Sequence, residues 1–246
     1  MDNLFLSLLI SMISGLSTMI GFLIIFIKNN NKNKIIYNSL IFSSFIMLFI
    51  SISDLIPNSF SLILRKYNIF FSIMLIITYI LFGFIIVEII NDKNKSKSDL
   101  YKIGIVSTMA MVMHNLPEGI ITFITTTKDV GLGINLAISI ALHNIPEGIS
   151  IAIPIYYSTK SKFKAFLYTF IAAIVEPIGA LLSLLFINNI NDYLFGIILS
   201  VTSGIMIYLS IFDLLKEARK YLKKREIVIK YLLIFIIILF IKIITK

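Results

Sequence analysis

The sequence predicts an all-α integral membrane protein with eight transmembrane helices. Of its 246 residues, 58% are hydrophobic and only 14% are charged, and the mean hydropathy is +0.97. Soluble domains are about 45–50% apolar, and a chain of this length has too little interior to bury so much apolar surface. The apolar residues also gather in runs of about 20 residues, which is the length that a membrane-spanning helix needs. A lipid bilayer is therefore the expected solvent.

The apolar runs divide the chain into eight predicted spans joined by short polar connections. The spans are 4–27, 35–57, 68–90, 102–125, 132–156, 163–187, 194–215 and 226–245. No connection is long enough for a soluble domain, so residues 1–246 are expected to form one transmembrane domain. The opening stretch "MDNLFLSLLI" lacks a basic region, and no small-residue cleavage site follows. It is expected to be a retained first span and not a signal peptide.

Lysine and arginine are concentrated in the odd-numbered connections, which hold sixteen of them against three in the even-numbered ones. The sixteen are Lys28, Lys32, Lys34, Lys93, Lys95, Lys97, Lys102, Lys160, Lys162, Lys164, Lys216, Arg219, Lys220, Lys223, Lys224 and Arg225; the three are Arg65, Lys66 and Lys128. By the positive-inside rule the odd connections face the cytoplasm of a cell-membrane protein, and both termini face outward. The net charge of +9 then reflects topology and anionic lipid, and it does not indicate a nucleic-acid partner.

A histidine–glutamate motif occurs twice in the middle of the chain, as "HNLPEG" in the fourth span and "HNIPEG" in the fifth. In each copy the histidine and glutamate are four residues apart (His114 with Glu118, His143 with Glu147), so they share one helix face about one turn apart. An imidazole and a carboxylate at that spacing can bind one divalent ion.

The residues around each pair complete the predicted site. Asn115 and Asn144 can each add an oxygen ligand, while Pro117 and Pro146 interrupt the helical hydrogen bonds and are expected to kink the helices. The chain has no cysteine, which excludes thiolate ligands. The fourth and fifth spans are expected to be antiparallel neighbours, with both motifs facing each other near the bilayer midplane.

The cost of burying these groups favours a functional interpretation. A charged side chain at mid-bilayer costs about 2.5–3.5 kcal/mol even on the lenient insertion scale. Buried helix-packing groups, protonated or hydrogen-bonded, are the alternative, but the two motif copies hold both histidines of the chain. A bound cation would compensate the glutamates.

A third carboxylate, Glu176 in "VEPIGA", lies near the middle of the sixth span, 29 residues after Glu147. It is expected to be a further ligand that could bridge two ions. A neutral glutamic acid at a helix kink is the alternative. Three glutamates with neutral histidines carry a charge of −3, so one divalent ion leaves −1 and two leave +1. Either charge is tolerable in a partly hydrated cavity.

The second and seventh spans share the pattern Ser-Ile-x-Asp-Leu, in "SISDLIP" and "SIFDLLK". Because these spans run in opposite directions, the repeat fits an inverted 3+2+3 arrangement, in which the first three spans mirror the last three. Asp54 would then lie on the outer side of the centre and Asp213 on the inner side. They are candidates for the entrance and exit of a cation path, or else each reaches water near a helix end.

The two HNxPEG motifs and "VEPIGA" resemble the ZIP family of divalent-metal transporters, most closely its short bacterial ZupT-type and GufA-type members. The resemblance implies a ZIP-like bundle of eight spans with both termini extracellular, commonly a homodimer, in which one helix bundle moves against another. It implies import of zinc, and often iron, manganese, cobalt or cadmium, as transported substrate, with no organic cofactor and no enzymatic activity. The implied one- or two-metal site comprises His114, Asn115, Glu118, His143, Asn144, Glu147 and Glu176.

Two other functions use the same residues. An intramembrane metallohydrolase would need a glutamate beside the first histidine to activate water, and asparagine stands there in both copies. A proton-coupled carrier could use the histidines and glutamates as a relay without metal. The third connection lacks the histidine-rich loop of many ZIP proteins, so a cytosolic metal-binding loop is not expected.

Overall fold

The computed structural model describes residues 2–27, 31–93, 98–186 and 191–244, and within these ranges the regular structure is helical, with no strand. The all-α prediction is therefore confirmed. The third, fourth, fifth, sixth and eighth predicted spans are single helices. They are α5 (Ile69–Lys93), α6 (Asp99–Lys128), α7 (Val130–Thr159), α8 (Lys162–Phe186) and α11 (Lys224–Ile244).

The other three predicted spans are helical rods with a local change of geometry. The first span comprises α1 (Asp2–Leu16), α2 (Thr18–Phe22) and the 3₁₀-helix η1 (Leu23–Phe26). The second span comprises α3 (Lys32–Ile50), the π-helix η2 (Ser51–Leu55) and α4 (Ile56–Leu64). The seventh span comprises α9 (Asp192–Tyr208), the π-helix η3 (Leu209–Leu214) and α10 (Leu215–Ala218). The sequence predicted the positions of these rods, but it did not predict the changes within them.

Six of the rods are long and apolar enough to cross a membrane, judged by length and composition over the described residues. They contain α1, α3, α5, α7, α8 and α9. Helix α6 is not among the six, and it carries the polar residues His114, Asn115 and Glu118. Helix α11 is not among them either, and its side chains from residue 237 onward lie outside the described part.

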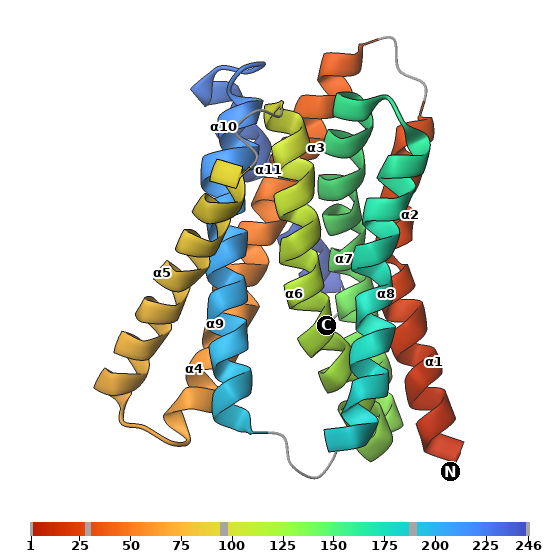
Figure 1. Cartoon of the computed structure of the whole chain (residues 1–246), viewed down its shortest axis with the longest axis vertical. Helices are drawn as coiled ribbons and strands as arrows, with labels where there is room; N and C mark the ends of the chain where they lie inside the picture. Colours follow the sequence, from red (N-terminus) through yellow and green to blue (C-terminus); the bar gives the residue numbers. More distant parts are fainter. Residues whose placement is uncertain (1, 28–30, 94–97, 187–190, 245–246) are drawn as a thin grey trace.

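Helix α1 and helices α3 to α9 run roughly along one axis, and their ends gather at two faces of the molecule (Figure 1). The lower end in Figure 1 holds the start of α1, the α4–α5 turn and the turn between α6 and α7; we call it the even end, because the second and fourth connections lie there. The upper end, where α6 and α8 begin and where α10 lies, is the odd end. Of the basic residues predicted at the odd end, Lys28, Lys95 and Lys97 lie outside the described residues.

The helices form two packed groups. The site group is α1, α2, η1, α6, α7 and α8, and its largest interfaces join α6 to α8 and to α7. The flanking group is α3, η2, α4, α5, α9, η3, α10 and α11, with α5 and α4 both packed on α9. The predicted neighbours α6 and α7 are thus confirmed as packed together. The groups meet mainly where α3 lies against α7 and α9 against α6.

Both π-helices coincide with the repeated Ser-Ile-x-Asp-Leu pattern. Residues Ser51–Leu55 form η2, and the second copy lies within η3 (Leu209–Leu214). A π turn widens the helix by one residue per turn and is frequent at functional sites. Two segments related only by a short sequence pattern therefore share a rare backbone geometry.

Candidate metal centre

Glu118 lies between the two histidines of the chain, near the middle of α6 and α7. Its Oε1 atom is 3.0 Å from Nε2 of His114, one turn back on α6, and 2.9 Å from Nε2 of His143 on α7. The contact with His143 has hydrogen-bond geometry, whereas the contact with His114 is close but lacks that geometry. The two motifs therefore face each other, as the sequence predicted.

Glu147, one turn beyond His143 on α7, completes a group of atoms that could serve as metal ligands. Its Oε1 lies 3.7 Å from Nε2 of His114, and one ligand atom each from His114, His143 and Glu147 lie within 4.8 Å of one another. Ligands about 2.0–2.2 Å from a tetrahedral zinc ion are separated by roughly 3.4 Å. Small side-chain shifts would thus bring these atoms around one ion.

Burial makes this cluster costly without a cation. His114 and Glu147 are fully buried and Glu118 is 7% exposed. Both carboxylate oxygens of Glu147, Oε2 of Glu118 and Nδ1 of His114 have no hydrogen-bond partner. Unpaired buried polar atoms are uncommon and costly in folded proteins. Their concentration at one point, with nitrogen and oxygen donors that suit zinc, iron, manganese or cobalt, fits a site for a divalent ion.

The two motif asparagines use their amide groups to hold neighbouring helices. Asn115 Nδ2 donates to the Ala172 carbonyl of α8 at 2.9 Å, and Asn144 Nδ2 donates to the Ser14 carbonyl of α1 at 3.1 Å. Both Oδ1 atoms are buried without a partner. Each asparagine therefore keeps an oxygen free, which is the atom a metal would need.

Glu176 is buried on α8 and is connected to the cluster through Asn144. Its Oε2 accepts a 3.0 Å hydrogen bond from Asn144 Nδ2. It does not belong to the group of ligand atoms within 4.8 Å that His114, His143 and Glu147 form. The structure therefore brings Glu176 next to the motif without placing it among those ligands.

Glycines allow the helices to approach closely around the cluster. A Cβ atom at Gly119 of α6 would overlap the backbone carbonyl of Glu176 on α8, and one at Gly148 of α7 would overlap the Thr18 carbonyl. Helices α6 and α8 therefore approach closely at Gly119. The contact places Glu118, on α6, beside the residue that carries the third carboxylate.

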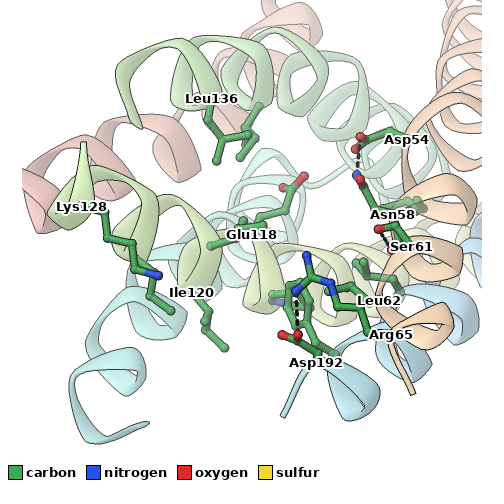
Figure 2. Close-up of a pocket in the computed structure, with 17 residues that line it drawn as sticks. Asp54, Asn58, Ser61, Leu62, Arg65, Glu118, Ile120, Lys128, Leu136 and Asp192 are labelled. Carbon is green, nitrogen blue, oxygen red and sulfur yellow. Dashed lines mark hydrogen bonds and ion pairs between the residues drawn. The ribbon is translucent and has the colours of Figure 1, made fainter. Parts of the chain in front are cut away.

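A cavity of about 520 Å³ reaches Glu118 from the even end (Figure 2). We call it the vestibule. Its polar lining comes from η2, α4 with the residue that follows it, α6 and α9: Asp54, Asn58, Ser61, Arg65, Glu118, Lys128 and Asp192. At its rim Arg65 forms a 2.6 Å ion pair with Asp192, and deeper in the vestibule Asn58 donates a 2.7 Å hydrogen bond to Asp54. The cluster is therefore accessible from one end of the molecule.

The two repeat aspartates lie on opposite sides of the cluster. Asp54 is exposed and lines the vestibule with Glu118. Asp213 is half-buried toward the odd end, where Asn91 Nδ2 lies 3.4 Å from its Oδ2. The structure thus brings Asp54 near the cluster and keeps Asp213 away from it.

Sequence reasoning missed the residues that act through their backbone or through tertiary packing. The Ser14 carbonyl holds Asn144, and Ser43 Oγ on α3 donates to the Pro146 carbonyl at 2.9 Å. Serines in apolar spans are common, so nothing in the sequence distinguished these two. The Arg65–Asp192 pair joins segments 127 residues apart, which no local pattern reveals.

Comparison with known proteins agrees with this geometry. Residues 88–241 match the family described as "ZIP Zinc transporter". The chain is 35% identical over 244 residues to the "Zinc transporter ZupT" of Oceanobacillus iheyensis, covering 90% of this chain and 91% of that protein. It is 33% identical over 254 residues to the protein of the same name from Clostridium perfringens, with 90% and 89% covered. The two relatives match nearly the whole chain, and they are transporters, not enzymes. The chain is a multi-pass membrane protein that belongs to the ZIP family of metal transporters.

Proposed function

We propose that the chain imports divalent transition-metal ions, zinc first, through a site that His114, Glu118, His143 and Glu147 form between α6 and α7. The observation that carries the proposal is the cluster itself: three ligand atoms within 4.8 Å, beside a glutamate that contacts both histidines. The names of the curated relatives favour zinc. Iron, manganese, cobalt and cadmium remain within reach of the same nitrogen and oxygen donors.

In the proposed mechanism the ion enters by the vestibule and exchanges with protons of the cluster. An imidazole can bind a metal only through an unprotonated nitrogen. The contacts of Glu118 Oε1 with the two Nε2 atoms, at 3.0 and 2.9 Å, are ion-pair and hydrogen-bond distances. An entering cation would therefore replace the proton shared between Glu118 and His143 and draw Glu147 inward. Asp54 would receive the ion first, because it lines the vestibule with Glu118.

A second ion would bind through Glu176 and the free oxygens of Asn115 and Asn144. These oxygens are buried and have no hydrogen-bond partner. With neutral histidines, the three glutamates give the site a net charge of −1 when one divalent ion is bound and +1 when two are bound. Binding of a second ion therefore requires the negative charge of Glu176. Rotation of the Asn144 amide away from Glu176 would release that carboxylate.

We further propose eight transmembrane spans, an inverted 3+2+3 repeat and an orientation with the odd end in the cytosol. The excess of lysine and arginine in the odd-numbered connections supports the orientation. The shared π-helical geometry of η2 and η3 supports the repeat. In this orientation the vestibule opens to the outside, both termini are extracellular, and Asp213 lies on the exit side. The protein would reside in the cell membrane, as a homodimer.

Uptake by purified protein in liposomes tests the function. Radiolabelled Zn²⁺ and Mn²⁺ should enter vesicles that contain the wild-type chain faster than they enter empty vesicles, and Glu118→Ala should remove the difference. Glu88→Gln is the matched control, because Glu88 is an exposed carboxylate on α5 outside the vestibule. Wild-type vesicles that take up neither ion would refute the proposal. Metal-independent proton transport that survives His143→Ala would favour the relay instead.

A further inference from the structure

The vestibule makes the two ends of the molecule different. From the even end it reaches Glu118, whereas the smaller cavity at the odd end, about 190 Å³ between η1 and α3, is lined by no residue of the cluster. On α6, Ile103 and Val106 are at most 3% exposed, and Leu209 and Leu214 of η3 are fully buried. An ion released to the odd end would need these side chains to separate.

An ion pair joins the two groups at the rim of the packed end. Lys220, just after α10, places its Nζ 2.7 Å from Oδ2 of Asp99, the first residue of α6. The same Nζ lies 2.6 Å from Oε2 of Glu217, whose residue is buried. Lys102 is a weaker partner, with its Nζ 3.8 Å from Oδ1 of Asp99. Glu217 therefore anchors Lys220 to the flanking group while Asp99 belongs to the site group.

This pair is the one that crosses between the groups, among the ion pairs whose two partners the structure describes. The Arg65–Asp192 pair joins α4 to α9 within the flanking group, and the histidine–glutamate contacts lie within the site group. A second polar link, from Ser43 Oγ to the Pro146 carbonyl, crosses deep in the interface. Lys220 also holds the pKa of Asp99 below its ordinary value, and Asp99 with Glu217 raises the pKa of Lys220.

We propose that Asp99, Lys220 and Glu217 form a latch that keeps the odd end closed while the vestibule is open. The inference rests on the proposed function in one respect: closing one end matters only if ions pass from one end to the other. Both Asp99 and Lys220 are about half exposed, with side-chain exposures of 61% and 50%. Such pairs contribute about 0–1 kcal/mol. The latch therefore shifts the equilibrium between a state that is closed at the odd end and a state that is open there, and breaking it costs little free energy.

Thiol accessibility measures this equilibrium directly, because the chain has no cysteine and one introduced cysteine is the sole thiol. Val106→Cys reports on the packed end, since Val106 is 1% exposed. Ser61→Cys reports on the vestibule, which Ser61 lines. A water-soluble maleimide is added to purified protein in detergent, and both alkylation rates are measured in the wild-type, Asp99→Asn and Lys220→Gln backgrounds.

Each latch variant should raise the alkylation rate of the cysteine in Val106→Cys about two- to five-fold, the change expected from the loss of one exposed ion pair. It should lower the alkylation rate of the cysteine in Ser61→Cys. Lys223→Gln is the matched control, because it removes an exposed lysine three residues beyond Lys220, and it should leave both rates unchanged.

Three results would overturn the latch. The first is a higher alkylation rate for Val106→Cys without a lower rate for Ser61→Cys, because that combination indicates local fraying of α6. The second is an equal effect of the control Lys223→Gln, and the third is unchanged alkylation rates in both latch variants. The assay requires no transport, so its outcome is distinct from that of the uptake experiment. If the wild-type chain failed to move zinc while both rates still shifted, the proposed function would fail and the latch would stand.

Discussion

Glu118 is the residue on which the proposed site depends most, because a single carboxylate oxygen contacts both histidines. Its replacement by alanine removes a ligand and the group that orients two imidazoles. We expect Glu118→Ala and His143→Ala each to weaken zinc binding by more than about 100-fold, since loss of an outer-sphere partner alone costs about 10–100-fold. Competition with a chelator of known affinity measures the change. Equal affinity in Glu118→Ala and the Glu88→Gln control would place the zinc elsewhere.

Protons should compete with zinc for the cluster. The ordinary pKa of histidine is about 6.5, and a protonated imidazole has no lone pair for a metal. Zinc affinity should therefore fall as the pH is lowered from about 7.5 to about 5.5, with fewer protons released in His143→Ala than in the wild type. Calorimetry in buffers of different ionisation enthalpy counts the protons released. Zinc binding without proton release would contradict the exchange step.

Glu176 separates the one-ion and two-ion accounts of the site. Since it accepts from Asn144 and does not belong to the histidine cluster, Glu176→Gln should leave one zinc bound and remove the second. Zinc analysis of the purified variant by mass spectrometry gives the stoichiometry. Loss of all bound zinc in Glu176→Gln would show that this residue is a ligand of the first ion.

The helices around the site are held at short distance by glycine. At Gly119 an added methyl group would meet the Glu176 carbonyl of α8. Gly119→Ala should lower the free energy of unfolding by about 1–3 kcal/mol, as for other overpacked interiors. Thermal unfolding followed by circular dichroism measures the change. Gly131→Ala is the control, because a methyl group there would meet only the Asp129 side chain, and an equal loss in the two variants would refute the packing argument.

The helical rods were largely predictable from the sequence, whereas their internal geometry was not. Runs of apolar residues locate spans because every membrane-spanning segment must satisfy its own backbone hydrogen bonds. The π-helices at Ser51–Leu55 and Leu209–Leu214 coincide with the repeated Ser-Ile-x-Asp-Leu pattern, which marked the two segments as related but did not reveal their backbone geometry.

The same division holds for the candidate site. The four-residue spacing of His114 with Glu118 and of His143 with Glu147 fixes a common face within each helix, so their convergence could be predicted. The hydrogen bond from Asn144 to the Ser14 carbonyl could not, because it joins segments 130 residues apart and uses the backbone of one of them. Glu176 was predicted as a ligand, and its hydrogen bond to Asn144 is a detail that only packing reveals.

For the molecule as a whole, the proposed orientation in the membrane rests on the distribution of positive charge. The cysteine-free chain allows Lys66→Cys and Lys164→Cys to be labelled one at a time, and both lysines are exposed. A membrane-impermeant maleimide added to intact cells should label Lys66→Cys, in an even-numbered connection, and spare Lys164→Cys until the cells are opened. The reverse pattern would invert the direction of transport that we propose.

The central claim is that the cluster between α6 and α7 holds the transported ion, and X-ray absorption at the zinc edge tests it most directly. Purified wild-type protein loaded with one equivalent of zinc should show two imidazole nitrogens at about 2.0–2.1 Å with carboxylate oxygens and no sulfur. His143→Ala should lose one of the two imidazoles, since the chain has no other histidine to replace it. A zinc environment without imidazole, or one that His143→Ala leaves unchanged, would contradict the claim.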